Sequence, residues 1–265
     1  MESASGIISS ELIARRFEAL RAESRRALVC YVTAGHPSPS ATVDLLQGLE
    51  SAGADVIELG VPFSDPVADG PIIQASSSTA LANGVTLDIS LELLRQAHVS
   101  VPVVLFTYLN PLLAAGPEVL TRAVAAGIAG ILVTDLPLGA DPGRERWLAE
   151  SSLDFIRLVA PTTPPSRLAG ICEHGGGFVY LISRMGVTGT RDDAPPDVAP
   201  MVARLREVTD LPVCVGFGIS TPAQARAVSR LADGVVVGSA IVQAAGESTD
   251  TALNLVRSMR EAMDG

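Results

Sequence analysis

The sequence predicts an α/β protein of the (β/α)8 TIM-barrel class with an additional N-terminal helix. Short apolar segments alternate with helix-like segments at intervals of roughly 25–45 residues, and eight such pairs occur. The strands are apolar throughout, as in a parallel sheet buried on both faces. No GxGxxG follows the first strand, which weighs against the runner-up, an open doubly wound sheet. Because no linker interrupts the pattern, we expect one domain over residues 1–265.

Each element is predicted from its own pattern, and several helices begin with Pro near their first turn or with a Ser/Thr cap such as Thr221. The predicted strands are Ala27–Thr33, Val56–Leu59, Val103–Thr107, Gly130–Val133, Phe155–Ala160, Phe178–Ile182, Val213–Gly216 and Gly234–Val237. The predicted helices between and after them are Ala41–Ala52, Ile89–Ala97, Pro117–Ala126, Gly143–Glu150, Pro165–His174, Val198–Val208, Pro222–Arg230 and Leu253–Ala262. Glu11–Leu20 is the additional helix, expected to cover the bottom of the barrel.

Composition excludes several classes of function. The net charge is −10 and no basic run occurs, so nucleic acid is not an expected partner. The apolar runs are far shorter than the ~20 residues of a membrane span, and the N-terminus does not read as a signal peptide. Cys30, Cys172 and Cys214 are widely spaced, which favours reduced thiols and a cytoplasmic location. The chain has no lysine, so Schiff-base chemistry and covalently held pyridoxal phosphate are excluded for this chain.

The segment 55–74 carries the strongest functional signal. Glu58 lies between Ile57 and Leu59 in a short strand, so its side chain points away from both. A Pro-, Asp- and Gly-rich loop follows and brings a second carboxylate, Asp69, before the chain turns helical at Ile72. In a (β/α)8 barrel the active face lies at the strand carboxyl ends, where both residues fall. Two carboxyl groups in different environments suit general acid/base catalysis.

Histidines do not form a metal site in this pattern. His98 and His174 end helices and fall on the opposite face, where each interacts with a helix C-terminus. His36 alone lies near the active face, and one histidine without neighbours is a weak metal ligand. No metal is therefore expected.

Glycine-rich turns follow the last three strands and predict a phosphate site. They are Ser183–Gly189, Gly216–Ser220 and Val237–Ala240, the last of which opens a short helix. Loops after strands seven and eight frequently bind phosphate in this fold. Ala160–Pro164 ends strand five and is interpreted mainly as a turn.

Together these segments resemble the tryptophan synthase α subunit family from about Tyr31 to Val242 and through the final helix. The segments are YVTAG (Tyr31–Gly35), ELGVPFSDPVADGPIIQ (Glu58–Gln74), APTT (Ala160–Thr163), SRMGVTG (Ser183–Gly189), GFGIS (Gly216–Ser220) and VGSAIV (Val237–Val242). The second is highly specific to that family, whereas the last two are shared with other phosphate-binding barrels.

The resemblance implies a lyase of tryptophan biosynthesis that cleaves indole-3-glycerol phosphate into indole and glyceraldehyde 3-phosphate. It implies Glu58 as general acid/base, Asp69 as hydrogen-bond acceptor for the indole N–H, and Tyr180 as a catalytic neighbour of Glu58. Glu58 must then be protonated part of the time near neutral pH, while Asp69 stays ionised. The residues implied to bind substrate are Tyr31, Tyr108, Thr188, Gly189, Phe217, Gly218, Gly238 and Ser239.

The resemblance also implies a partner, a β subunit that holds pyridoxal phosphate, in an αββα complex. No cofactor is expected in this chain. Asp65, Pro66 and Asn110 are the candidate contacts with that partner. Tyr31, His36 and Thr134 differ from residues common in the family and bear on substrate fit.

Three alternatives stay open from the sequence. A stand-alone lyase that releases free indole would use the same residues. A barrel that binds sugar phosphates without catalysis would not need Glu58 and Asp69. An isomerase of a related phosphoribosyl substrate fits the fold but leaves the segment Glu58–Gln74 unexplained.

Overall fold

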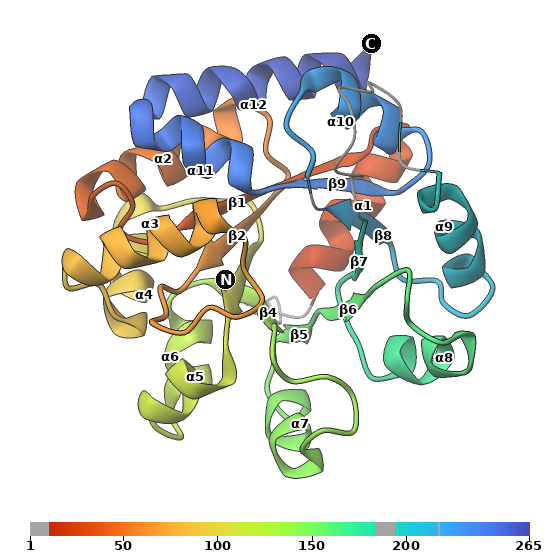
Figure 1. The fold of residues 1–265 in the computed structure, drawn as a ribbon, viewed down its shortest axis with the longest axis horizontal. Helices are drawn as coiled ribbons and strands as arrows, with labels where there is room; N and C mark the ends of the chain where they lie inside the picture. Colours follow the sequence, from red (N-terminus) through yellow and green to blue (C-terminus); the bar gives the residue numbers. More distant parts are fainter. Residues whose placement is uncertain (1–10, 184–193, 195, 217) are drawn as a thin grey trace, which may run out of the picture.

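The computed structural model describes residues 11–183, 194, 196–216 and 218–265. Their strands form one parallel sheet, rolled into a barrel inside a ring of helices (Figure 1), in the order β5-β4-β3-β2-β1-β9-β8-β7-β6. The predicted barrel class is confirmed. The strands are β1 (Ala27–Thr33), β2 (Val56–Gly60), β3 (Val103–Thr107), β4 (Ile128–Val133), β5 (Asp154–Phe155), β6 (Arg157–Val159), β7 (Val179–Ile182), β8 (Val213–Gly216) and β9 (Gly234–Val237).

The fifth strand position is shared by two short strands. The sequence predicts a single strand over Phe155–Ala160, but within the described part of the chain β5 pairs only with β4 and β6 only with β7. Ile156 alone separates them, and its N–H donates to the carbonyl of Ile131, 2.9 Å away. The barrel is therefore closed here by the chain itself, which runs from β5 through Ile156 into β6. β5 pairs with the strand on one side, and β6 pairs with the strand on the other.

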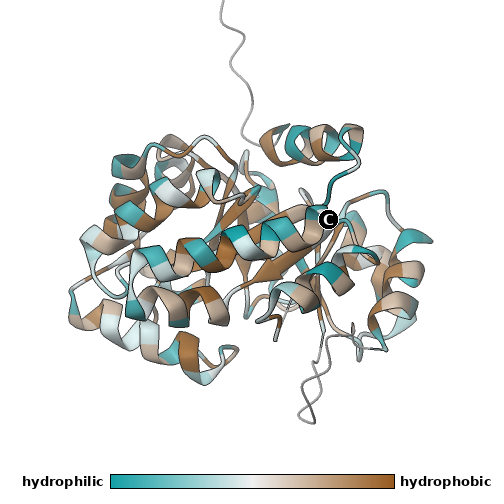
Figure 2. Cartoon of the chain, turned by 90° about the horizontal axis from the view of Figure 1, so that it is seen from above, coloured by the Kyte–Doolittle hydropathy of each residue, from teal (hydrophilic) through white to brown (hydrophobic). Residues whose placement is uncertain are grey.

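The barrel interior is filled by alternate strand residues and by α1 (Leu12–Ala22), as the sequence predicts for an N-terminal helix. Ile13 and Phe17 of α1 are buried among inward-facing residues such as Val29 and Val56, and the rings of Phe17 and Phe178 lie 5.9 Å apart. These partners lie in the amino-terminal parts of the strands, so α1 covers the end of the barrel opposite the strand carboxyl ends. Figure 2 shows the hydrophobic residues gathered on the strands inside the helices.

Asp55 stabilises the end of the barrel that α1 covers. It is only 1% exposed and forms ion pairs with Arg16 of α1 and with Arg260 of the last helix. Its Oδ2 also accepts from the N–H of Leu28, 2.8 Å away. One buried carboxylate thus joins α1, β1 and the C-terminal helix.

The remaining helices surround the barrel. They are α2 (Pro39–Ser51), α3 (Pro71–Ala82), α4 (Leu87–Ala97), α5 (Leu109–Ala114), α6 (Val119–Ala125), α7 (Pro142–Ala149), α8 (Pro165–Glu173), α9 (Val198–Arg206), α10 (Pro222–Ser229), α11 (Ser239–Glu247) and α12 (Thr249–Asp264). The sequence predicts no helix over residues 109–114, where the short helix α5 lies. Pro111 falls in the first turn, where its missing N–H has no helical partner to lose. Within the described residues, no helix is long and apolar enough to cross a membrane.

Candidate active site

A cavity of about 390 Å³ opens at the carboxyl ends of the strands. Both carboxyl groups singled out in the sequence lie on its wall, together with four of the residues expected at the phosphate or indole, and with Tyr180. These lining residues are Tyr31, Glu58, Asp69, Tyr180, Gly218, Gly238 and Ser239. The cavity is thus lined by residues of five strands and of the loops that follow them: β1, β2, β7, β8 and β9. In a barrel of parallel strands all carboxyl ends lie on the same face, so these residues meet there.

Glu58 is the buried acid of this cavity. It lies in β2 opposite Tyr31 of β1, is 1% exposed, and faces the interior because Ile57 and Leu59 face the outer layer. Within the described residues its Oε1 has no hydrogen-bond partner. Burial away from water raises the pKa of Glu58 to about 8, since the charged form loses its hydration. Near neutral pH Glu58 therefore holds a proton that it can donate.

Two tyrosine rings help to keep this region dry. Tyr31 packs edge-on against Phe106, with centroids 5.1 Å apart, and its hydroxyl lies where a Cβ of Gly60 would be. Tyr180 reaches in the same way over Gly216. The Tyr31 hydroxyl accepts from Thr33 Oγ1, 3.4 Å away. Burial raises the pKa of both tyrosines well above the ordinary range, so both hydroxyls stay neutral.

Asp69 is held on its loop by Tyr108. The Tyr108 hydroxyl donates to Asp69 Oδ2 at 3.1 Å and accepts from the N–H of Ala68 at 3.0 Å. The Tyr108 ring also packs against Phe63, with centroids 5.0 Å apart. Burial raises the pKa of Asp69, and the hydrogen bond from Tyr108 opposes that rise. Tyr108 was expected around the indole, but it lies behind Asp69 and is not among the lining residues of the cavity.

The opposite wall of the cavity suits an anion. Gly218 follows β8 with φ +78°, a backbone conformation that favours glycine. Gly238 precedes α11 and Ser239 is its first residue, and because both line the cavity, the N-terminal end of this helix forms part of its wall. Thr188, Gly189 and Phe217, also expected at the substrate, lie outside the described residues.

The three candidate partner contacts are accessible. Asp65 and Asn110 are exposed and Pro66 is half-buried, and they belong to the segments that follow β2 and β3. Val67, beside them in the loop, is 85% exposed. An exposed valine next to the loop of Asp69 marks this part of the active face as accessible to another molecule.

Sequence reasoning did not identify several lining residues, among them Phe106, Leu158 and Ile73. Phe106 and Leu158 lie two residues after Val104 and Ile156, which also face the interior. The alternation of a strand could therefore have identified both. Ile73 gives no such signal, because its place depends on how α3 packs over β1. Thr134, noted from sequence for its hydroxyl, also lines the cavity.

No group of three or more His, Cys, Asp or Glu in the described residues is arranged to hold a metal ion. His98 and His174 cap the ends of α4 and α8, as expected. His36 packs near α11, where burial lowers its pKa. The cavity therefore combines a buried carboxyl with a raised pKa, a second carboxyl on a loop, and the N-terminal end of α11.

The fold and this site define a barrel enzyme that works by acid/base catalysis on a phosphorylated substrate. The family model of the tryptophan synthase alpha chain matches residues 17–264. The alpha chain of Gluconacetobacter diazotrophicus is 47% identical over 242 residues, covering 90% of this chain and 88% of the relative. That of Synechocystis sp. is 47% identical over 243 residues, covering 90% and 92%.

Solved structures agree with these sequence relatives. The α subunit from Legionella pneumophila superposes with a TM-score of 0.87 at 36% identity, covering 95% of this chain and 98% of that one. Tryptophan synthase from Mycobacterium tuberculosis gives a TM-score of 0.87 at 36% identity, covering 95% and 97%. The chain belongs to the tryptophan synthase alpha chain family. It is a carbon–carbon lyase that cleaves indole-3-glycerol phosphate.

Proposed function

We propose that Glu58 and Asp69 together cleave indole-3-glycerol phosphate into indole and glyceraldehyde 3-phosphate in this chain. Protonated Glu58 donates its proton to indole C3, which places positive charge on the ring nitrogen. The resulting carboxylate then takes the proton of the hydroxyl on the glycerol carbon bonded to C3. The carbon–carbon bond breaks, its electrons return to the ring, and an aldehyde forms. Glu58 ends protonated again, so the cycle balances.

The observation that carries this proposal is the unpartnered, buried carboxyl of Glu58 on the wall of the cavity. A carboxyl that is 1% exposed, with one oxygen free of hydrogen bonds within the described residues, is costly unless it serves a reaction. Its pKa of about 8 suits a group that must both donate and accept a proton near neutral pH. Tyr180, on the same cavity wall, is proposed to pack beside Glu58 and the substrate.

Asp69 is proposed to accept a hydrogen bond from the indole N–H and to stabilise the positive charge that develops there. The Tyr108 hydroxyl fixes one of its oxygens, which leaves the other for the ring. A charge-assisted hydrogen bond of this kind strengthens as charge develops, so it favours the transition state over the bound substrate. Tyr31 is proposed to pack against the indole ring.

The phosphate is proposed to bind at Gly218, Gly238 and Ser239, where the N-terminus of α11 supplies N–H groups. Thr188, Gly189 and Phe217 belong to the same proposal through the family resemblance alone. This chain is proposed to need no cofactor of its own, because the reaction uses only proton transfers and an indole ring that can hold charge.

We further propose that the chain acts with a β subunit holding pyridoxal phosphate, in an αββα complex. Asp65, Pro66 and Asn110 are the proposed contacts, supported by their accessibility beside the loop of Asp69. The chain is proposed to be one domain over 1–265, supported by the continuous sheet that joins β1 to β9. Location in the cytoplasm stays a prediction from the three free, buried cysteines.

The test is indole release from indole-3-glycerol phosphate by the purified chain, with and without a β subunit. We expect slow release by the chain alone and a rise of at least ~10-fold with the β subunit, about 1.4 kcal/mol of coupling. Asp65→Arg is expected to reduce the rise without changing release by the chain alone. A fast rate that does not change with the β subunit would favour the stand-alone lyase. No release under either condition would exclude the reaction.

A further inference from the structure

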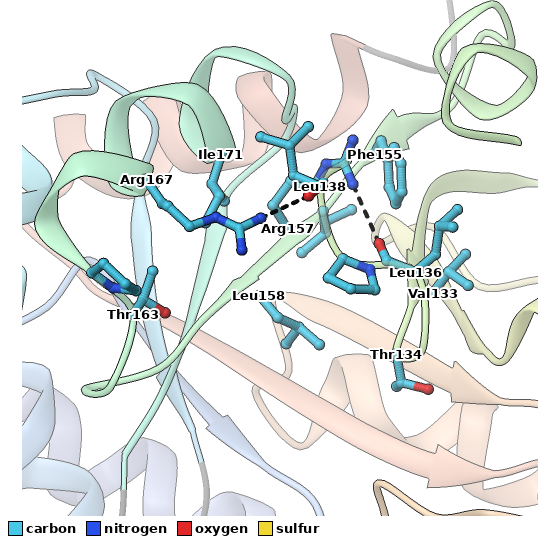
Figure 3. A pocket seen from close by; sticks show the side chains of 13 residues that line it. Val133, Thr134, Leu136, Leu138, Phe155, Arg157, Leu158, Thr163, Arg167 and Ile171 are labelled. Atoms are coloured by element: carbon cyan, nitrogen blue, oxygen red, sulfur yellow. Dashed lines mark hydrogen bonds between the residues drawn. The ribbon is translucent and has the colours of Figure 1, made fainter. Parts of the chain in front are cut away.

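A second cavity, of about 180 Å³, lies behind the wall of the active-site cavity and has no role in the reaction described above. Among the residues that the structure describes, only Leu158 and Thr134 line both cavities. Figure 3 shows these two side chains on one side of the second cavity, with Ile171, Leu138 and Phe155 on the other. The two residues therefore form a wall one side chain thick between two spaces. We call the second space the side cavity.

The side cavity lies between the barrel interior and the outer layer. Leu158 packs with the residues that fill the barrel interior. Val133, Phe155 and Ile171, which line only the side cavity, belong to the outer layer between strands and helices. A path outward from the active site thus leads through Leu158 and Thr134 into space that neither layer fills.

The side cavity suits a small neutral group. Its buried cation, Arg157, is already bound: it donates to Glu145 Oε2 at 3.2 Å and to the carbonyl of His174 at 3.0 Å. Arg167 donates to the carbonyl of Leu138 at 2.7 Å. The buried charge of Arg157 is therefore paired with Glu145, whereas Arg167 is exposed to solvent, and most of the remaining surface is apolar.

The topology places this wall at the far end of the substrate from its phosphate. Counted around the barrel from β1, β4 is fourth, the β5–β6 position is fifth, β8 is seventh and β9 is eighth. Positions four apart face each other across an eight-position barrel. Thr134, directly after β4, therefore faces the β9 end that carries Gly238 and Ser239. A substrate whose phosphate lies there points its benzene ring toward Thr134 and Leu158.

We propose that Leu158 and Thr134 set the size limit for the indole ring, and that the side cavity is a pocket for ring substituents once Leu158 is shortened. This inference rests on the proposed function, because it uses the proposed position of the phosphate. The ligand class is indole-3-glycerol phosphate with a small neutral group on its benzene ring. A methyl group occupies far less than 180 Å³, so removal of part of Leu158 provides sufficient room.

The test compares 5-methyl- and 6-methyl-indole-3-glycerol phosphate with the unsubstituted substrate, through the ratio of their kcat/KM values. For Leu158→Ala we expect this ratio to rise at least ~10-fold over the wild type for one of the two, since one extra methyl group in an apolar pocket is worth about 10–200-fold. Leu158→Val is the milder variant, should the Ala variant not fold, and is expected to give a smaller rise in the same direction.

Two controls decide whether the side cavity provides the room. Ile182→Ala shortens another apolar side chain on the active-site wall that does not border the side cavity, and its ratio is expected to stay within about threefold of the wild type. Ile171→Phe, added to Leu158→Ala, fills the side cavity from α8 and is expected to cancel the gain. Equal gains in Leu158→Ala and Ile182→Ala, no gain, or a gain that persists with Ile171→Phe would each overturn the proposal. Wild-type cleavage of the unsubstituted substrate, read in the same experiment, tests the proposed function separately.

Discussion

Tyr108 donates a hydrogen bond to Asp69, with its hydroxyl oxygen 3.1 Å from Oδ2. The same hydroxyl accepts from the N–H of Ala68, so one phenol fixes both the carboxylate and the backbone next to it. Asp69 belongs to a loop, and loops position side chains less rigidly than strands do. Tyr108 directly follows β3, so its hydrogen bond ties the carboxylate of Asp69 to the end of a strand. This hydrogen bond therefore helps to give the second carboxylate a defined position relative to Glu58.

Tyr108→Phe is the first prediction. It removes this donor and keeps the ring that packs on Phe63, so turnover should fall by about 10-fold or more, the factor expected for a hydrogen bond to a charged group. Binding of glycerol 3-phosphate, which uses the opposite wall, should change less than about twofold. Steady-state kinetics and an inhibition constant provide both readings. Unchanged turnover would mean that Asp69 is positioned without Tyr108.

Glu58→Gln is the second prediction. The variant keeps the size of the side chain and removes the exchangeable carboxyl proton, so turnover should fall at least ~100-fold, the usual scale for a general acid/base. The dissociation constant of glycerol 3-phosphate should stay near that of the wild type. Glu50→Gln, an exposed glutamate on α2, is the matched control and should retain full turnover. Near-normal turnover in Glu58→Gln would remove Glu58 from the mechanism.

The third prediction concerns the pH dependence of stability. The pKa of Glu58 is about 8 in the folded state against 4.5 as the ordinary value, so between these pH values the folded chain binds a proton that the unfolded chain does not. This group therefore makes the free energy of unfolding fall as pH rises from about 4.5 to 8, by up to about 1.4 kcal/mol per pH unit. Below and above that window it contributes no pH dependence.

Glu58→Gln should remove this contribution. Urea unfolding of both proteins at pH 5, 6.5 and 8 should show the variant gaining stability relative to the wild type as pH rises. A constant difference across these pH values would contradict the raised pKa of Glu58.

The fourth prediction concerns the proposed phosphate site at Gly218, Gly238 and Ser239. Ser239→Asp adds a negative charge at the first residue of α11, on the cavity wall, and should raise KM at least ~10-fold, the effect of 1.4 kcal/mol of repulsion. Ser239→Asn adds a side chain of similar size without charge and should raise KM less. Equal effects of the two variants would indicate a steric cause rather than a bound anion.

The fifth prediction concerns the closed end of the barrel. Asp55→Asn leaves Arg16 and Arg260 without their shared carboxylate, and breaking a buried ion pair costs about 3–5 kcal/mol. Arg15→Ala removes an exposed pair with Glu11 and should cost about 1 kcal/mol or less. Urea unfolding measures both. A loss below about 1 kcal/mol for Asp55→Asn would show that the carboxylate is not needed to hold α1 and α12.

Most of the barrel could be predicted because apolar strands and amphipathic helices alternate locally, and the pattern needs no knowledge of distant contacts. The exceptions have physical reasons. Helix α5 has only six residues, too few to give a clear periodic pattern, and it contains Pro111, a residue that stops a helix or begins one depending on where the first turn falls. The division between β5 and β6 depends on pairing with two different neighbours, which a strand pattern does not encode.

In the candidate site, too, some residues could be predicted from the sequence and others could not. Glu58 and Asp69 could be singled out because a carboxylate in an apolar strand and another in the next loop are costly or unusual in themselves. The position of Tyr108 behind Asp69 could not be predicted, because it depends on the path of the loop after β2. Strand alternation could place Leu158 on the interior face, but its proposed role follows from the spaces on its two sides, which the sequence does not show.

The division of the fifth strand position has a dynamic consequence. β5 and β6 contribute two and three residues, and among the described residues each is paired with a single neighbouring strand, so we expect this seam to open at a lower free energy than strands paired on both sides. Backbone amides of residues 154–159 should exchange with deuterium sooner than those of β1, which is paired on both sides. Leu158 lies in that seam. Substitutions at Leu158 therefore fall in a short strand paired on one side, away from β2, which holds Glu58 and is paired on both sides.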